Sequence, residues 1–484
     1  MKALGILGTS SGAGKSWIAT AVCAWLRKEG VRVAPFKAQN MSNNAWATLD
    51  GGEIARAQAV QAEACGLLPT ADMNPILLKP SGAQGSQLVL RGQAQGYQSA
   101  DSYYRNFDNL WQMVKDTLDG WQSKCDVLVL EGAGSPVELN LMERDLVNLR
   151  PLQYLDGRGV LVGDIDRGGI YAQLAGTWNL LPGEDQARLL GAIVNRFRGD
   201  INLFPDPNRW LAPHAPGLNV LGTVPLRTDL QPEEEDGLCA ADEDRGHGEV
   251  VAWIRLPHVA NLTDCQPWWD DEGVRIRWVK SAADLATARA IVIPGTKNTI
   301  ADLRWLKMTG LDQAIVSAVH AGIPVVGLCG GYQILGERLT DQAGVAGDPG
   351  DERGLGLLPL ITNFEQKKIV RQVNAFCGGN HWVTYETHMG RTVPTRPFEP
   401  LHWVEDANGR REEGARVGNV WGTYLHGWFE SPEVRQLLIS AAGICGYRPC
   451  PFTWLERRRK TYDAMAEHLV AHVNLDPIRR YLGL

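Results

Sequence analysis

Residues 8–16 read GTSSGAGKS, and this stretch predicts a loop that holds phosphate groups. It directly follows the apolar run 4–7 and precedes an amphipathic stretch, 17–28, so we expect a strand, a glycine-rich turn and a helix in succession. Backbone N–H groups in such a loop, together with the helix N-terminus, bind phosphate oxygens. The loop is one residue longer than the usual pattern, because Thr9 stands where the opening glycine is expected and Gly8 opens it instead.

The residues predicted to bind ATP all belong to this loop. Lys15 supplies a cation for the phosphates, and the Ser16 hydroxyl suits Mg²⁺, which prefers oxygen ligands. The predicted ATP-binding set is Gly8, Thr9, Ser10, Gly12, Gly14, Lys15 and Ser16. ATP and Mg²⁺ are therefore the predicted cofactors.

The composition is that of a soluble globular protein of two or three domains. The chain has 484 residues, of which 44% are hydrophobic and 21% charged. A net charge of −7 argues against nucleic acid and anionic membranes as partners. Nine scattered cysteines without a C-x-x-C pair indicate a reducing cytoplasm. No run of about 18 apolar residues predicts a membrane-spanning helix.

An acidic stretch divides the chain. Residues 231–249 (QPEEEDGLCAADEDRGHGE) have few large apolar side chains and cannot bury enough surface to fold alone. We therefore predict a first domain over 1–236, a linker over 237–249 and a second domain over 250–484. The helical, charged tail from about 453 is expected to pack on the second domain.

Both halves alternate short apolar strands with helical stretches, which predicts an α/β fold with mostly parallel sheets in each domain. The predicted strands of the first half are 4–7, 31–36, 127–130, 160–162, 190–194 and 220–224; those of the second half are 250–256, 290–293 and 324–328.

Further polar residues follow strands of the first half, at the sheet edge where parallel sheets bind ligands. Glu131 ends the strand 127–130, and a carboxylate there is a candidate Mg²⁺ ligand, as is Glu53. The remaining candidates for contact with phosphate or substrate are Lys37, Gln39, Asn40, Asp164, Asp166 and Arg167, for which a solvated loop and a local ion pair are the alternatives.

The second half contains a candidate nucleophile. Residues 323–335 read IPVVGLCGGYQIL, so Cys329 lies on a sharp turn between an apolar strand and a helix, with small neighbours. The Gly330 N–H is placed to stabilise an oxyanion, and Gly295 and Thr296 in the loop IPGTKN are candidates for a second donor. The base must be a distant histidine. Spacing alone does not choose between His426 in GTYLHGWF and His388 in YETHMG.

These motifs resemble known families. The phosphate loop is similar to that of the dethiobiotin-synthetase-like P-loop enzymes, and the cysteine turn resembles the class I glutamine amidotransferases. The chain as a whole resembles the cobyric acid synthase family in eight stretches, in order: GTSSGAGKS, PFKAQNMSNN (35–44), NPILLKP (74–80), DIDRGG (164–169), VNRFRGD (194–200), PGTKNTIADL (294–303), GLCGGYQILGE (327–337) and YETHMG (385–390). The segment LPHVANLTD (256–264) is also close to a family segment, which often has Arg in place of His258.

This resemblance implies that His426, in Y-L-H-G, is the base. The wider amidotransferase class has Glu two positions after that histidine, where this chain has Trp428. We therefore expect either a Cys–His dyad or a carboxylate from elsewhere, such as Glu386, to orient His426.

The resemblance also implies a reaction. ATP phosphorylates a carboxylate of a corrin ring, and ammonia released from glutamine displaces the phosphate, at four carboxylates of adenosylcobyrinic acid a,c-diamide. The alternatives are a cobyrinic acid a,c-diamide synthase, a non-enzymatic P-loop ATPase switch, and an inactive amidotransferase module used for binding.

Overall fold

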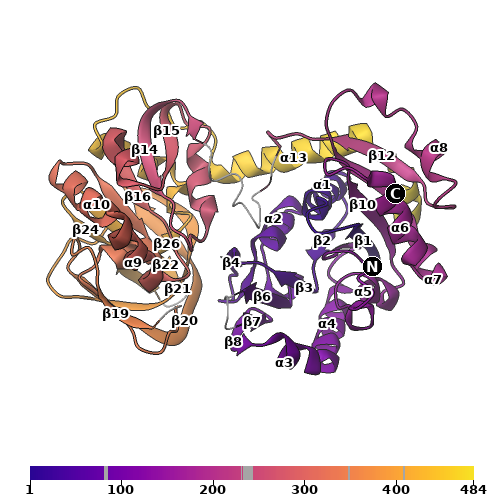
Figure 1. The fold of residues 1–484 in the computed structure, drawn as a ribbon, viewed down its shortest axis with the longest axis horizontal. Coiled ribbons are helices and arrows are strands. Elements are labelled where there is room, and N and C mark those ends of the chain that lie inside the picture. The colour runs from indigo at the N-terminus through magenta and orange to yellow at the C-terminus, as the bar shows by residue number, and fades with distance from the viewer. Residues whose placement is uncertain (81–84, 231, 233–243, 347–348, 407–408) are drawn as a thin grey trace. The chain divides into compact units, whose positions relative to one another are not determined.

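The computed structural model describes residues 1–80, 85–230, 232, 244–346, 349–406 and 409–484 (Figure 1). These residues form two compact units. Unit 1 contains 1–43, 53–235 and 457–484, and unit 2 contains 44–52 and 236–456. Across the described ranges, we find no helix that is both long and apolar enough to cross a membrane.

Unit 1 is built on a sheet of six parallel strands, as predicted. In spatial order the strands are β12 (Val220–Pro225), β11 (Leu189–Phe197), β10 (Arg158–Asp164), β1 (Lys2–Gly8), β9 (Val127–Glu131) and β2 (Val33–Phe36). The chain moves to one side of β1 with β2 and β9 and then to the other side with β10 to β12. The carboxyl ends of β1, β9 and β10 therefore meet where the strand order reverses, which is where open α/β sheets bind ligands.

Helices cover both faces of this sheet, so each strand is buried on two sides and the central part of its sequence is apolar. The helices of unit 1 before the tail are α1 (Lys15–Lys28), α2 (Arg56–Ala64), α3 (Ala100–Arg105), α4 (Phe107–Trp121), α5 (Leu149–Tyr154), α6 (Ile170–Leu180), α7 (Gly183–Gln186) and α8 (Pro207–Leu211). A smaller sheet that the sequence did not predict comprises β3 (Gln39–Met41), β6 (Ile76–Pro80), β7 (Ser86–Leu90) and β8 (Gln93–Gln98).

The C-terminal tail packs on unit 1, and the prediction that it packs on the second domain is wrong. It forms α13 (Trp454–His472) and α14 (Asp476–Leu482). Apolar side chains of the tail, including Met465 and Leu469, are buried in the same cluster as the apolar side of α1. The Tyr481 hydroxyl also donates to the Ala3 carbonyl at 3.0 Å. The charge of the tail misled the prediction, because one narrow apolar stripe is enough to fix a helix to a sheet.

Unit 2 has a second mostly parallel sheet. Its strands, in spatial order, are β13 (Arg245–Gly246), β15 (Gly273–Val279), β14 (Gly248–Ile254), β16 (Ala288–Ile293), β17 (Val325–Leu328), β25 (Val420–Thr423) and β24 (Ala415–Val417); only β13 and β24, at the two edges, run antiparallel to their neighbours. Of the predicted linker, 237–243 lies outside the described residues. The sheet itself begins inside the remaining part, because Arg245 and Gly246 pair with β15.

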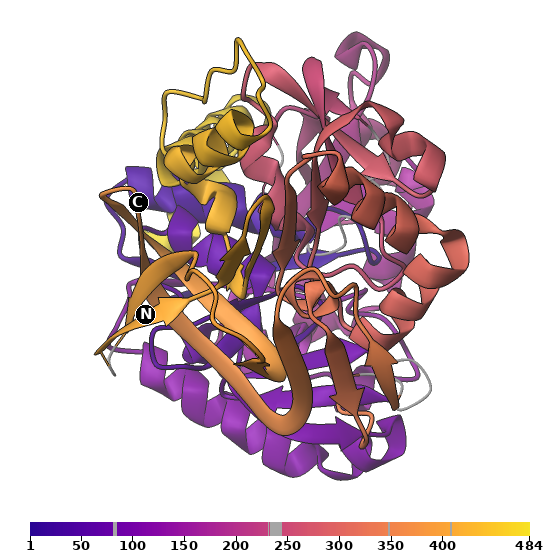
Figure 2. The ribbon, with the colours of Figure 1, turned by 90° about the vertical axis from the view of Figure 1, so that its left-hand side faces the viewer.

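A long antiparallel hairpin adds a further sheet to unit 2, and the sequence did not predict it. Its strands β20 (Leu360–Cys377) and β21 (Asn380–Pro394) form the curved orange ribbon in Figure 2. The other strands of this sheet are β18 (Arg338–Asp341), β19 (Gly350–Arg353), β22 (His402–Asp406), β23 (Gly409–Glu413) and β26 (Leu425–His426). The helices of unit 2 are α9 (Thr299–Thr309), α10 (Leu311–His320), α11 (Gly330–Leu335) and α12 (Pro432–Ala441).

Candidate functional site

The phosphate loop of unit 1 has the backbone conformation that its glycines predict. Gly12 and Gly14 have φ angles of +73° and +89°, in the left-handed region that favours glycine, and Gly14 caps α1. Lys15 folds over the loop, where its Nζ donates to the Ser10 carbonyl at 2.9 Å and to the Gly134 carbonyl at 3.0 Å. The loop thus holds a cation beside backbone N–H groups, as an anionic ligand requires.

Neighbouring strands anchor this loop. The Thr9 N–H donates to the Val162 carbonyl at 2.9 Å, and Asn195 Nδ2 donates to the Ala13 carbonyl at 3.1 Å. Sequence reasoning missed Asn195, although the signal was present, because Asn195 lies near the carboxyl end of β11 in the quoted stretch VNRFRGD.

Glu131 lies at the centre of a buried polar cluster at the carboxyl end of β9. Ser16 Oγ donates to its carboxylate at 2.7 Å, Lys37 Nζ pairs with it at 2.9 Å, and the Gln61 amide donates to it. Burial by itself raises the pKa of Glu131, but the Lys37 ammonium and the hydrogen-bond donors, Gln61 and Ser16 among them, outweigh burial and lower it. The carboxylate is therefore ionised, and it faces a hydroxyl.

The pair Ser16–Glu131 fits a magnesium ion. Mg²⁺ is usually held by one or two protein oxygens, with water and substrate phosphates as its other ligands. The described residues contain no group of three or more His, Cys, Asp or Glu side chains placed to hold a metal. A magnesium ion bound mainly by phosphates and water does not need such a group, and the Ser16 and Glu131 oxygens beside the phosphate loop are sufficient.

Two of the predicted ligand-contacting residues after β2, Lys37 and Asn40, are buried rather than solvated. Lys37 and Asn40 are 5% and 4% exposed, and Asn40 Nδ2 donates to Gln58 Oε1 at 2.8 Å. Gln39 accepts a hydrogen bond from the Tyr103 hydroxyl. Lys37 and Asn40 thus belong to the network around Glu131. Glu53 is also buried, and it forms an ion pair with Lys79; its role as a metal ligand stays a prediction.

Asp164 is buried at the end of β10 and organises a group of arginines. It accepts from the Asp166 N–H at 2.9 Å and lies 3.4 Å from Arg196 and 3.6 Å from Arg167. A Cβ built on Gly12 would lie 3.0 Å from the Arg167 guanidinium, so this cation lies over the phosphate loop. Arg196 is a second cation in this group that the sequence did not single out.

In unit 2, Cys329 sits on the strained turn that the sequence predicts. It links β17 to α11 with φ +50° and ψ −107°, a conformation that costs a non-glycine residue about 1–3 kcal/mol. A Cβ built on Gly330 would lie 2.5 Å from Thr296 Cγ2, so a larger side chain would clash at this position. The thiol is 8% exposed and its Sγ donates to the Thr387 carbonyl at 3.5 Å.

His426 lies beside Cys329 and is oriented by Asp264. A Cβ on Gly295 would lie 3.0 Å from His426 Cε1 and 3.6 Å from Cys329 Cβ, so Gly295 leaves room for both side chains. Asp264 Oδ2 is 2.7 Å from His426 Nδ1, and Oδ1 accepts from the Gly427 N–H at 2.7 Å. Burial lowers the pKa of His426, but the Asp264 carboxylate and the Cys329 thiolate outweigh it and raise the pKa to about 10.

The suggestion that Glu386 orients His426 is wrong. Glu386 points into a cluster with Arg371 at 3.0 Å, Arg411, and His388 Nε2 at 3.7 Å. Burial raises its pKa, whereas His388 and the two arginines outweigh burial and lower it to about 2. His388 does not serve as the base, because both of its ring nitrogens face other groups. Its Nδ1 contacts the Gly390 carbonyl at 2.9 Å, and its Nε2 faces Glu386.

Asp264 is the functional residue that sequence reasoning missed in this unit. It stands in LPHVANLTD, within the short 3₁₀-helical segment η6 (Leu262–Trp268), far from His426 in the sequence. One sequence feature could have identified Asp264. It is the acidic residue of LPHVANLTD, a stretch that follows the carboxyl end of β14, where parallel sheets place functional residues. A nucleophile, a base and an orienting carboxylate are thereby assembled from three separate segments.

The predicted oxyanion loop lies against the cysteine turn. A Cβ on Gly330 would lie 2.9 Å from Thr296 N, and Thr296 pairs with Val259 in an isolated antiparallel bridge. The structure therefore brings together Cys329, Gly330, Gly295, Thr296 and His426, all predicted from the sequence.

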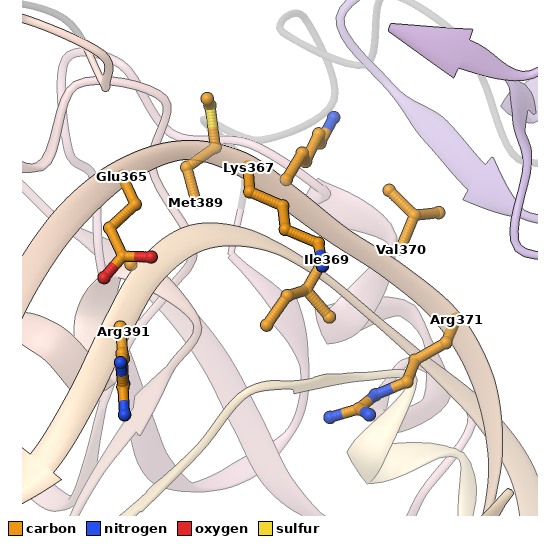
Figure 3. Close-up of a pocket in the computed structure, with 9 residues that line it drawn as sticks. Glu365, Lys367, Ile369, Val370, Arg371, Met389 and Arg391 are labelled. Carbon is orange, nitrogen blue, oxygen red and sulfur yellow. The ribbon is translucent and has the colours of Figure 1, made fainter. Parts of the chain in front are cut away.

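A cavity of about 480 Å³ lies in the hairpin, where β20 bulges between Phe364 and Ile369 (Figure 3). Lys367, Lys368, Arg371 and Arg391 line it together with Glu365. Its β21 side begins at Met389, two residues after the carbonyl that Cys329 contacts. A lining with several cations and one carboxylate suits a small ligand that carries a carboxylate and an ammonium.

Comparison with known proteins assigns both units to families. Residues 4–238 match the CobQ/CobB/MinD/ParA nucleotide binding domain, and residues 250–434 match the CobB/CobQ-like glutamine amidotransferase domain. The first unit therefore binds a nucleotide.

Curated relatives cover nearly the whole chain. A cobyric acid synthase of Roseiflexus castenholzii is 43% identical over 98% of this chain and 97% of its own length. One from Chloroflexus aggregans is 45% identical over 89% of each chain, and one from Synechocystis is 39% identical over 100% of this chain and 99% of its own.

Proposed function

The chain belongs to the cobyric acid synthase family, and from this premise we propose that it amidates four carboxylates of adenosylcobyrinic acid a,c-diamide to give adenosylcobyric acid. It is an enzyme of glutamine-dependent amidation in cobalamin biosynthesis. The observation that carries the proposal is the assembly of Cys329, His426 and Asp264 in a chain that also has a phosphate loop beside Glu131. A non-enzymatic ATPase switch would not require the site formed by Cys329, His426 and Asp264.

In unit 2 we assign Cys329 the release of ammonia. Its sulfur attacks the side-chain amide carbon of glutamine, and the carbonyl electrons move to oxygen. His426 takes the thiol proton during the attack. As the carbonyl re-forms and the C–N bond breaks, His426 gives that proton to the departing nitrogen, so ammonia leaves and a thioester remains on Cys329. Water, deprotonated by His426, then hydrolyses the thioester to glutamate. Asp264 keeps the His426 ring in position, with Nδ1 fixed and Nε2 facing the reaction.

In unit 1 we assign the phosphate loop the activation of a substrate carboxylate. A carboxylate is a poor electrophile, so transfer of the ATP γ-phosphate to it creates a leaving group that ammonia displaces. Lys15 neutralises phosphate charge, and Ser16 with Glu131 would hold Mg²⁺, which supplies charge compensation between phosphates. Arg167, Lys37 and Asp164 are proposed to face phosphate or substrate.

We further propose that the cavity in the β20–β21 hairpin receives the amino-acid end of glutamine. Arg391 and the lysines of its lining suit the α-carboxylate, and Glu365 suits the α-ammonium. We place the reaction in the cytoplasm, where ATP is available and thiols such as Cys329 stay reduced.

A mass-spectrometric amidation assay tests the proposal. Purified protein is incubated with adenosylcobyrinic acid a,c-diamide, Mg-ATP and glutamine, and the corrinoid mass is followed over time. Four successive replacements of OH by NH₂ are expected. In a parallel incubation with cobyrinic acid, amidation that stops after the a and c positions would identify the alternative, a cobyrinic acid a,c-diamide synthase. An unchanged corrinoid with continued ATP hydrolysis would contradict the proposed substrate.

Replacement of Asp264 by Asn is expected to lower kcat for glutamine hydrolysis by on the order of 10²–10⁴-fold, since the amide no longer stabilises an imidazolium. The pKa of His426 should fall from about 10 towards its ordinary value. At pH 7 fewer His426 rings then carry the positive charge that would stabilise a sulfur anion, so Cys329 should react more slowly with iodoacetamide.

The raised pKa of His426 predicts the pH range over which its ion pair with Asp264 contributes. Because the folded-state pKa of His426 is raised, its ion pair stabilises the fold fully below about pH 6.5 and is lost as pH rises through about 10. Wild-type His426 stays protonated up to about pH 10, whereas in Asp264→Asn it should lose its proton nearer pH 6.5. The rates of Cys329 alkylation, measured between pH 5 and 10 for both proteins, should therefore differ most between these two values. Asp341→Asn, another buried aspartate of unit 2, is the matched control. Identical profiles for Asp264→Asn and wild type would exclude the role of Asp264.

A further inference from the structure

We propose that Asp302 is a positioning residue of the glutamine-hydrolysing reaction, because its carboxylate holds Thr296 so that the Thr296 N–H faces the oxyanion formed at Cys329. The proposal rests on the proposed function of unit 2 and adds a residue to it. Asp302 lies in the first turn of α9 and is fully buried.

The carboxylate of Asp302 joins two separate loops. One oxygen accepts the hydroxyl proton of Thr296, and the Thr296 oxygen in turn accepts from the Asn298 N–H at 3.1 Å. The other oxygen lies 2.7 Å from His258 Nδ1, and the His258 N–H approaches both oxygens at 3.2 and 3.3 Å. Both the proton and a lone pair of the Thr296 hydroxyl are thus engaged, which fixes its side-chain rotamer.

The backbone of the two loops is also paired. The Ala260 N–H donates to the Gly295 carbonyl at 2.8 Å, and the Lys297 N–H donates to the His258 carbonyl at 3.0 Å. These two bonds flank the bridge between Val259 and Thr296. Val259 and Thr296 therefore form a non-hydrogen-bonded antiparallel pair, in which the flanking residues make the hydrogen bonds between the two segments. The Thr296 N–H points away from the segment that contains Val259.

The Thr296 N–H is therefore available to the reaction at Cys329. A Cβ on Gly330 would lie 2.9 Å from Thr296 N, and one on Gly295 would lie 3.6 Å from Cys329 Cβ. When the Cys329 sulfur bonds to the amide carbon of glutamine, negative charge forms on the former carbonyl oxygen. Two N–H groups, of Gly330 and Thr296, then border this position, and fixed donors stabilise such charge best because they need no reorganisation.

Burial supports this role. Burial raises the pKa of Asp302 above its ordinary value. The hydrogen bonds from Thr296 and His258 lower the pKa but do not fully offset burial. A fully buried carboxylate is stabilised only when donors surround it, and here the donors belong to the two loops that border Cys329. Asp302 makes no contact with the thiol itself, so its effect must pass through Thr296.

The test separates oxyanion stabilisation from the reactivity of the thiol. Attack on glutamine builds an oxyanion, whereas alkylation of Cys329 by iodoacetamide displaces iodide and builds none. In the full-length protein, Asp302→Ala is expected to lower kcat for glutamine by about tenfold or more, with KM changed by less than about threefold. Alkylation of Cys329, followed by mass spectrometry of its peptide, should stay within about twofold of wild type.

Two further variants make the test strict. Thr296→Val removes the hydroxyl that Asp302 holds and should lower kcat similarly, and the double variant should be no slower than the slower single variant. Asp341→Ala is the matched control, since Asp341 is equally buried and accepts from Val345 N and Ala346 N, both at 2.8 Å, at the end of β18.

The outcomes are distinguishable. Two results would overturn the proposal: losses of kcat that multiply in the double variant, or a fall in alkylation that parallels the fall in kcat for Asp302→Ala. In either case Asp302 would act on the cysteine turn as a whole and not through Thr296. An unchanged kcat would overturn it as well. Failure of the wild type to hydrolyse glutamine would instead refute the proposed function of unit 2.

Discussion

Replacement of Cys329 by Ala is expected to abolish amidation with glutamine and to leave amidation with ammonium salts intact. The variant lacks the sulfur that forms the thioester, and no neighbour identified at the site replaces it, since His426 is held by Asp264. Covalent catalysis of this kind accounts for a rate loss on the order of 10⁴-fold or more. Unit 1 would still receive ammonia from solution, so ATP-dependent amidation continues.

The measurement is the corrinoid mass after incubation with Mg-ATP and either nitrogen source, at a pH near 8.5 so that more of the ammonium is free ammonia. Cys445→Ala is the matched control, because Cys445 is an exposed cysteine of the same unit, outside the site. Continued use of glutamine by the Cys329 variant would exclude this cysteine as the nucleophile. Loss of both nitrogen sources would mean that the substitution disturbs more than ammonia release.

Lys15→Ala has the opposite signature, with amidation lost for glutamine and ammonium salts alike. The Lys15 ammonium lies over the phosphate loop, bonded to the Ser10 and Gly134 carbonyls. Phosphoryl transfer depends on neutralising charge on the phosphates, and removing one such group costs on the order of 10²–10³-fold in rate, or about 3–4 kcal/mol. No choice of nitrogen source bypasses this step, because both react with the same activated carboxylate.

The control for Lys15 is Lys28→Ala, at the exposed end of the same helix, where the lysine pairs with Glu467 at 2.7 Å. It should amidate at the wild-type rate. Nucleotide affinity, measured by calorimetry with a non-hydrolysable ATP analogue, shows whether Lys15→Ala acts on binding or on the transfer. Ammonium-driven amidation that survives in Lys15→Ala would contradict the role of this lysine.

The sequence predicted those elements whose local pattern is strong. All nine predicted strands exist, because a strand buried on both faces is apolar throughout and is followed by a turn. The cysteine turn was predicted because an apolar strand runs directly into Cys329 and two glycines, and the structure shows that a Cβ at Gly330 or Gly331 would clash with the neighbouring loop. The hairpin of β20 and β21 was missed because its strands are half exposed and rich in charge, so their alternation is weak.

The remaining differences come from contacts between distant segments. Asp264 and His426 are more than 160 positions apart, and no local pattern links them. Glu386, suggested from the sequence as a carboxylate that orients His426, instead pairs with Arg371 and Arg411. A carboxylate's partner depends on the register of strands, and that register is set by the whole sheet.

The packing of α13 and α14 on the first sheet has a consequence for synthesis on the ribosome. Residues 1–235 leave the ribosome about 220 residues before 457–484, which corresponds to roughly 10–45 s at about 5–20 residues per second. Until then, the apolar side of α1 that buries Met465 and Leu469 has no cover. The nascent chain therefore carries an exposed hydrophobic surface throughout translation of unit 2. We expect a chaperone to bind it in that interval, and a stop codon before 457 to yield an aggregating product.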